Sequence, residues 1–131
     1  MLSPEVKKRK LQKLIQYLND LKKHENSSFD QFMENHYEVE RIIQLLIESS
    51  SDLIFHELSK HNVTPDSYRE AFILAGKKDI LPEELANSLA LATGMRNILV
   101  HEYETIDYKL VHQSIKTALR DFAEFLKVLS E

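Results

Sequence analysis

The chain contains no cysteine, no tryptophan, and only two glycines and three prolines among its 131 residues. The absence of cysteine excludes a disulfide framework, a thiolate nucleophile and a cysteine-ligated zinc site. So few glycines and prolines leave little material for the tight turns of a β-sandwich or barrel. No apolar run approaches the roughly 20 residues of a membrane-spanning helix, and residues 1–5 lack a signal-peptide core. We therefore expect a soluble, cytoplasmic protein without a membrane segment.

What the sequence does contain is the composition of a globular protein. Hydrophobic residues make up 43% of the chain and charged residues 29%, a balance that argues against intrinsic disorder. The length suits one domain, residues 1–131. Apolar residues recur with a helical period along nearly the whole chain, so the predicted fold class is all-α.

The periodicity divides the chain into consecutive helices. The predicted segments are one that ends at the polar run 26–28, one from about 29 to 61, one from 64–65 to about 76, one that opens at 82, and one after a break at 104–107. Ser28 and Gln31 have the spacing of a capping box at the start of the second helix. That helix is apolar on more than one side, which predicts a central helix or a contribution to a dimer interface.

Arg96 interrupts the apolar stripe of the helix that opens at Pro82. A guanidinium is costly to bury alone, so it must meet an acid such as Asp52, reach a wet cleft, or face a second subunit. His101 follows five residues later, about 140° around an ideal helix. The two side chains would converge only if the helix unwinds near Val100, or if two protomers share a groove. Read alone, His101 fits a helix-end histidine near the C-terminal dipole better than it fits a catalyst.

Residues 94–103, GMRNILVHEY, resemble the R-x-x-x-x-H-x-Y signature of the HEPN superfamily. The resemblance is specifically to the HepT-like ribonuclease toxins, which are paired with MntA-type nucleotidyltransferase antitoxins. Arg96 and His101 match the defining pair, Asn97 matches the polar residue that often follows the arginine, and Tyr103 matches a modifiable tyrosine. The sequence resembles this family over roughly residues 5–130, including residues 37–46, 52–56, 64–70 and 106–108.

The resemblance implies an up-and-down bundle of four to five helices that forms a homodimer, with both motifs lining one cleft. It implies metal-independent endoribonuclease activity on RNA, with no cofactor. The ribose 2′-hydroxyl would attack the adjacent phosphorus, leaving a 2′,3′-cyclic phosphate and a 5′-hydroxyl. In this assignment His101 is the general base or acid, a role that suits imidazole near neutral pH. Arg96 clamps the phosphate and Asn97 helps to orient it.

The resemblance also gives Tyr103 a regulatory role, because the antitoxin of HepT-like systems attaches AMP units to this tyrosine and so neutralises the toxin. Its structural alternative is a buried aromatic residue that closes the helix end. Asp52 and His56 lie four residues apart and so share a helix face. They would neutralise or orient Arg96 or contribute to the cleft, with simple structural pairing as the alternative.

The sequence is compatible with two other functions. The main alternative is a non-catalytic HEPN adaptor that binds a nucleotidyltransferase or a nucleotide, and a structural bundle without any ligand is the third. The histidines at 56 and 61 are one position too far apart for the H-E-x-x-H zinc motif. Residues 1–23 carry seven Lys or Arg against two acids, a segment that could guide RNA phosphates or simply be a solvated helix face.

Overall fold

The structure is a computed structural model that describes residues 3–131, except for the side chain of Tyr103. The helices are α1 (Pro4–Lys22), α2 (Phe29–Glu34), α3 (His36–Ser59), α4 (Tyr68–Lys77), α5 (Glu83–His101), the 3₁₀ turn η1 (Tyr103–Thr105) and α6 (Tyr108–Ser130). No strand occurs among residues 3–131, so the prediction of an all-α fold is confirmed. Within the same residues, none of the helices combines the length and apolarity needed to cross a bilayer.

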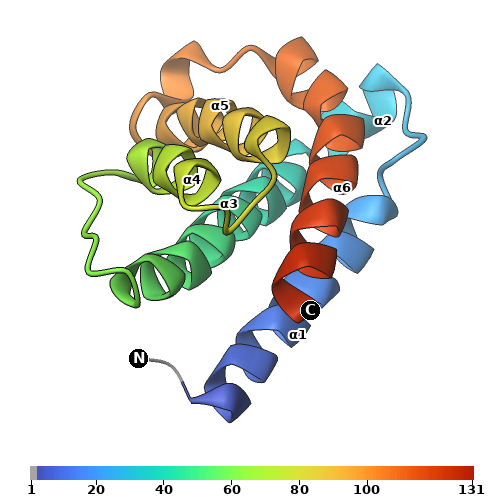
Figure 1. Ribbon diagram of the computed structural model, residues 1–131. Coiled ribbons are helices and arrows are strands. Elements are labelled where there is room, and N and C mark those ends of the chain that lie inside the picture. The colour runs from blue at the N-terminus through green and yellow to red at the C-terminus, as the bar shows by residue number, and fades with distance from the viewer. Residues whose placement is uncertain (1–2) are drawn as a thin grey trace.

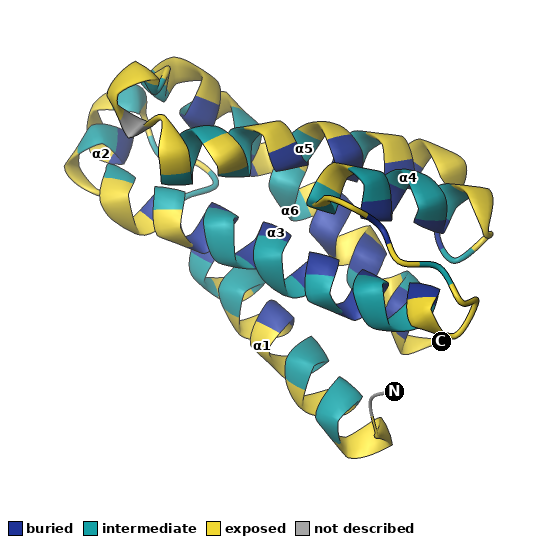
Figure 2. Cartoon of the chain, turned by 90° about the vertical axis from the view of Figure 1, so that its left-hand side faces the viewer, coloured by how far each residue is buried: buried dark blue, intermediate teal, exposed yellow. Residues whose placement is uncertain are grey.

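Helix α3 is the centre of the bundle, as its apolar character predicts. It contacts α1, α2, α4, α5 and α6, with α4 and α5 on one side and α1 and α6 on the other (Figure 1). Its buried hydrophobic residues are Val39, Ile42, Ile43, Leu46, Ile47, Leu53, Ile54 and Leu58. Figure 2 shows buried residues recurring along α3 and exposed residues along the outer side of α5. The core therefore lies around α3, and α5 presents one face to solvent.

The long helix expected from about 29 to 61 is wrong in one respect, because it is broken at Asn35. The backbone there leaves the helical region, with φ −126° and ψ 19°, so α2 ends at Glu34 and α3 begins at His36. The Asn35 side chain donates a hydrogen bond to the Gln31 carbonyl at 3.2 Å, a local bond of the kind that competes with helix continuation. The predicted capping box of Ser28 and Gln31 is confirmed.

The start predicted for the third helix at Thr64 and Pro65 is also wrong. Helix α4 begins three residues later, at Tyr68, and Ser67 is its N-cap. The Ser67 hydroxyl accepts a hydrogen bond from the Glu70 backbone N–H at 3.0 Å. The Glu70 carboxylate accepts one from the Asp66 N–H at 2.8 Å, so two backbone donors are satisfied at Ser67 rather than at Thr64. This shift places Tyr68 in the first turn of α4.

The two glycines have opposite surroundings. A Cβ added to Gly76 would lie 2.8 Å from the Cβ of Ala86, so α4 and α5 approach too closely there for a side chain. A Cβ added to Gly94, in the middle of α5, would meet nothing within 4 Å. The packing of this chain therefore explains Gly76 and leaves Gly94 unexplained.

Alanine at these two positions should change stability in opposite directions. Gly94→Ala should raise the free energy of unfolding by up to about 1 kcal/mol, because alanine favours a helix and finds open space. Gly76→Ala should lower it by about 1 kcal/mol, because overpacking costs about 1–3 kcal/mol and exceeds the gain in helix propensity. Urea denaturation of both variants measures this. If both variants raised the free energy of unfolding, or both lowered it, the different surroundings of Gly76 and Gly94 would be contradicted.

Candidate functional site

The guanidinium of Arg96 is held at a junction of three helices. Its Nε and Nη2 each lie 2.7 Å from Oε2 of Glu48 on α3. Its Cζ lies 4.9 Å from the centroid of the Tyr68 ring on α4. On α5 itself, Nη1 donates to Oδ1 of Asn97 at 3.4 Å. The Arg96 side chain is 16% exposed, so the guanidinium is largely enclosed yet reaches the surface.

These contacts resolve the electrostatic problem of an arginine within an apolar stripe. A guanidinium stays protonated, so partial burial requires an acid within hydrogen-bonding distance, and Glu48 supplies it. The Glu48 carboxylate also accepts a hydrogen bond from Nε2 of Gln44 at 3.2 Å, which fixes it from its own helix. The Tyr68 ring adds a cation–π contact on the face of the guanidinium. The charge of Arg96 is therefore fixed in position as well as balanced.

Sequence reasoning chose the wrong acid for Arg96. Asp52, one helical turn beyond Glu48, pairs with Nζ of Lys10 on α1 at 2.5 Å instead. His56 lies 3.8 Å from Asp52 through Nε2, so the predicted shared face of these two residues is confirmed. Asp52 therefore faces α1, and the acid that meets Arg96 is Glu48. The sequence did not identify Glu48 or Tyr68 as partners of Arg96. The one indication of Glu48 in the sequence is that it precedes Asp52 by four residues and so lies on the same face of the helix.

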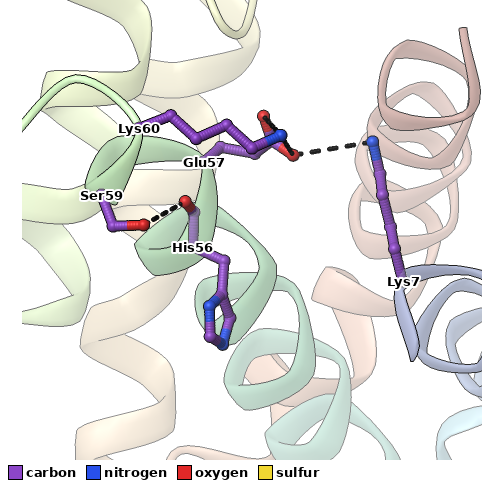
Figure 3. Close-up of polar contacts among 5 residues, drawn as sticks. All are labelled: Lys7, His56, Glu57, Ser59 and Lys60. Carbon is purple, nitrogen blue, oxygen red and sulfur yellow. Dashed lines mark hydrogen bonds and ion pairs between the residues drawn. The ribbon is translucent and has the colours of Figure 1, made fainter. Parts of the chain in front are cut away.

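The C-terminal end of α3 is tied to α1 by further charges. Glu57 pairs with Lys7 at 3.6 Å and with Lys60 at 3.3 Å. Figure 3 shows the imidazole of His56 pointing away from this cluster, while its backbone carbonyl accepts a hydrogen bond from Ser59 at 2.6 Å. Lys7, on the basic N-terminal segment, is therefore engaged with an acid of this chain. No group of three or more acids and histidines able to hold a metal ion occurs among the described residues.

His101 is the last residue of α5 and is exposed. The helix stays regular up to this point, and the Glu102 N–H donates to the Ile98 carbonyl at 2.9 Å. Helix unwinding near Val100, one of the two ways to bring Arg96 and His101 together, is therefore wrong. Asn97 is also exposed and lies beside Arg96. The side chain of Tyr103, the predicted modification site, lies outside the described part of the chain.

A groove of about 580 Å³ opens beside Arg96, between the start of α4 and the middle of α5. Tyr68 and Asn97, the two neighbours of the guanidinium on α4 and α5, both line this groove. A ligand in the groove would therefore lie next to the charge of Arg96. The arrangement suits an anionic ligand that carries an aromatic or polar group beside its charge.

Residues 11–129 match the family model described as ribonuclease HepT-like. The chain belongs to the HepT-like ribonuclease family. The tRNA nuclease HepT of Aphanizomenon flos-aquae is 37% identical across 98% of this chain and 90% of its own length. The mRNA nuclease HepT of Shewanella oneidensis is 31% identical over 65 residues, which is 50% of this chain and 49% of that protein. The prediction of a ribonuclease with the HEPN motif is confirmed by this membership.

Solved structures share the fold of this HepT-like chain. A tri-AMPylated HEPN toxin of Shewanella oneidensis, solved in complex with an MNT antitoxin, superposes with a TM-score of 0.87. It is 22% identical, and the match covers 98% of each chain. A toxin–antitoxin crystal structure with AMP-PNP gives a TM-score of 0.84 at 22% identity, covering 97% of this chain and 99% of the other. The predicted HEPN-type bundle is therefore confirmed.

Glu48 should matter more to this HepT-like protein than the acid one turn away. Glu48→Ala leaves an enclosed guanidinium without its acid, so we expect a loss of about 1–3 kcal/mol in the free energy of unfolding. Asp52→Ala should cost less than about 1 kcal/mol, because its pair with Lys10 is more exposed than the Arg96–Glu48 pair and is screened by water. Chemical denaturation of the two variants provides the comparison. Equal losses would mean that Glu48 is not the main partner of Arg96.

Proposed function

We propose that this chain is the toxin of a HEPN/nucleotidyltransferase toxin–antitoxin pair, an endoribonuclease that cleaves cellular RNA in the cytoplasm without a metal ion. The observation that carries the proposal is the fixed guanidinium of Arg96, held by Glu48 and Tyr68 at the edge of a groove. Family membership and two HepT nucleases among its relatives support it. An adaptor that only binds a partner has less need of an arginine and a histidine together in one motif.

The contacts of Arg96 leave part of the guanidinium for a phosphate. Of the five N–H donors of an arginine, Glu48 takes two and Asn97 takes one, so two remain. Directed at the non-bridging oxygens, these donors would stabilise the charge that builds on the pentacoordinate phosphorus. Asn97 is on the exposed side of the guanidinium and would help to orient the same phosphate. Arg96 is thus the phosphate clamp of the proposal.

His101 would transfer protons in the same step. The 2′-hydroxyl oxygen bonds to phosphorus, and its proton passes to a base. The bond from phosphorus to the 5′-oxygen breaks, and that oxygen receives a proton as it leaves. The products are a 2′,3′-cyclic phosphate and a 5′-hydroxyl. The exposure of His101 supports either the basic or the acidic role, because the imidazole is accessible to the substrate.

The proposal includes a homodimer. In one regular helix, His101 and Arg96 are directed about 140° apart, so a second copy is needed to bring a histidine to the phosphate held by Arg96. An apolar patch supports such an association, since Leu91 is 73% exposed and Leu110 is 52% exposed. Both line a groove of about 420 Å³ between α5 and α6. Exposed apolar patches of this kind mark sites of protein association. Asp52 and His56 remain proposed as contributors to the shared cleft.

Neutralisation would follow from AMP transfer to Tyr103 by an MntA-like nucleotidyltransferase. The tri-AMPylated toxin, bound to its antitoxin, is a structural neighbour of this chain and supports this part of the proposal. Tyr103 is two residues beyond His101 in the sequence. Phosphates attached there would compete with RNA for the anion site and repel its backbone.

Removal of either motif residue should strongly lower the rate of RNA cleavage. In an assay of purified protein with total RNA in EDTA, His101→Ala should lower the cleavage rate about 100- to 10,000-fold. Arg96→Ala should lower it about 100- to 1,000-fold. His61→Ala, which removes an exposed imidazole elsewhere, should cleave like the parent. Absence of cleavage by the parent would favour the non-catalytic adaptor, and full activity of His101→Ala would contradict the catalytic role of His101.

Co-expression with an MntA-like nucleotidyltransferase should produce AMP adducts on this chain. Intact-mass spectrometry should show one or more increments of an AMP unit, with peptide mapping to Tyr103. Tyr103→Phe removes the acceptor oxygen and should carry no adduct, whereas Tyr37→Phe, at an exposed tyrosine on α3, should be modified like the parent. Adducts on another residue would contradict the assignment of Tyr103.

A further inference from the structure

The two sides of the groove beside Arg96 carry different kinds of side chain. One side is formed by α5, where Ala90, Thr93 and Gly94 carry small side chains or none, and where Leu91 and Asn97 also line the groove. The Thr93 hydroxyl is turned back to the Ala90 carbonyl at 2.6 Å, so it is already satisfied within the helix. The opposite side comes from α3 and the start of α4, and carries aromatic and charged residues. The groove therefore combines an α5 side of mostly small and apolar residues with an opposite side of aromatic and charged residues.

The side opposite α5 contains both stacking and hydrogen-bonding groups. The rings of Phe55 and Tyr68 lie with their centroids 6.0 Å apart, inclined at 48°. The exposed side chains of Asp66 and Arg69 line the same groove, one an acceptor and the other a donor. Splayed bases of single-stranded RNA are recognised by aromatic contact together with hydrogen bonds to their edges. The groove offers both kinds of contact.

Gly94 fits the same interpretation. Glycine weakens the interior of an exposed helix, and nothing in the packing of this chain requires one at this position. Any larger residue at 94 would place its side chain beside the groove that Gly94 lines. The absence of a side chain keeps this side of the groove open to a ligand.

We propose that this groove is the subsite for a nucleobase adjacent to the phosphodiester held by Arg96, and that Asp66 and Arg69 select the base. The inference rests on the proposed ribonuclease function. Tyr68 and Asn97 line the groove and also contact the guanidinium, at 4.9 Å to the ring centroid and 3.4 Å, so base and phosphate would occupy neighbouring positions. A volume of about 580 Å³ lies within the range of about 300–1,000 Å³ typical of small-ligand sites.

Binding of uncleavable RNA tests the subsite separately from catalysis. Fluorescent 2′-O-methyl hexanucleotides composed of A, of C, of U, or of alternating G and U lack the free nucleophile and report affinity alone. By fluorescence anisotropy, the parent should prefer one composition over the weakest by at least about tenfold, the discrimination of one well-bonded base edge. Asp66→Asn and Arg69→Gln should reduce this ratio to below about threefold. Asp79→Asn, at an exposed aspartate after α4, should keep it.

A second experiment fills the groove with a larger side chain at position 94. Gly94→Leu should fold, because leucine favours a helix and the position is open. It should weaken binding of every hexanucleotide about tenfold, as expected from the loss of one stacked base. Light scattering follows the oligomeric state of each variant. If Gly94→Leu changes the oligomeric state and leaves the base preference intact, the groove is a face between copies and the subsite proposal is overturned.

The remaining outcomes separate the two proposals. A parent that binds all four compositions alike, or variants that keep its preference, would overturn the subsite. A parent that discriminates bases through Asp66 and Arg69 but leaves unmodified RNA uncut would retain the subsite and remove the ribonuclease function. If the parent cleaves RNA with a base preference, and that preference changes in the Asp66 and Arg69 variants, both the ribonuclease function and the subsite are supported.

Discussion

The ion pair between Arg96 and Glu48 is the contact on which the site depends. It joins α5 to α3 through two N–H groups and a single carboxylate oxygen, and Tyr68 adds α4 beneath the guanidinium. Because arginine does not lose its proton, the charge must be balanced by a partner rather than removed. The ion pair with Glu48 offsets the cost of burying the arginine in an apolar stripe. It also fixes the direction of the N–H donors of Arg96 that Glu48 does not use.

This arrangement divides the motif between an enclosed cation and an exposed imidazole. Arg96 is directed at the junction of α3 and α4, while His101 lies at the exposed end of α5. A regular helix is rigid over these five residues, so the separation is built into the backbone. Chemistry that needs both groups at one phosphate therefore calls for a second copy of the chain. In our proposal, the groove beside Arg96 holds the nucleotide next to that phosphate.

The helices were largely predictable because burial on one face leaves a period of 3.6 residues in the sequence. The errors lie at element ends, where several polar residues compete for the same backbone donors. Ser67 rather than Thr64 caps α4, and Asn35 interrupts what reads as one long helix. Apolar periodicity continues through both positions, so it carries no information about which local hydrogen bond forms.

The amino-acid sequence by itself determined the helical class, the central position of α3 and the motif that contains Arg96, Asn97 and His101. It also required that Arg96 find a partner, since a buried guanidinium is costly alone. Only the tertiary structure decided that the partner is Glu48. Glu48 and Asp52 are one turn apart on the same helix, so they are nearly equivalent in a sequence pattern. Which of them meets Arg96 depends on how α3 and α5 are rotated and shifted against each other, and that follows from packing of the whole core.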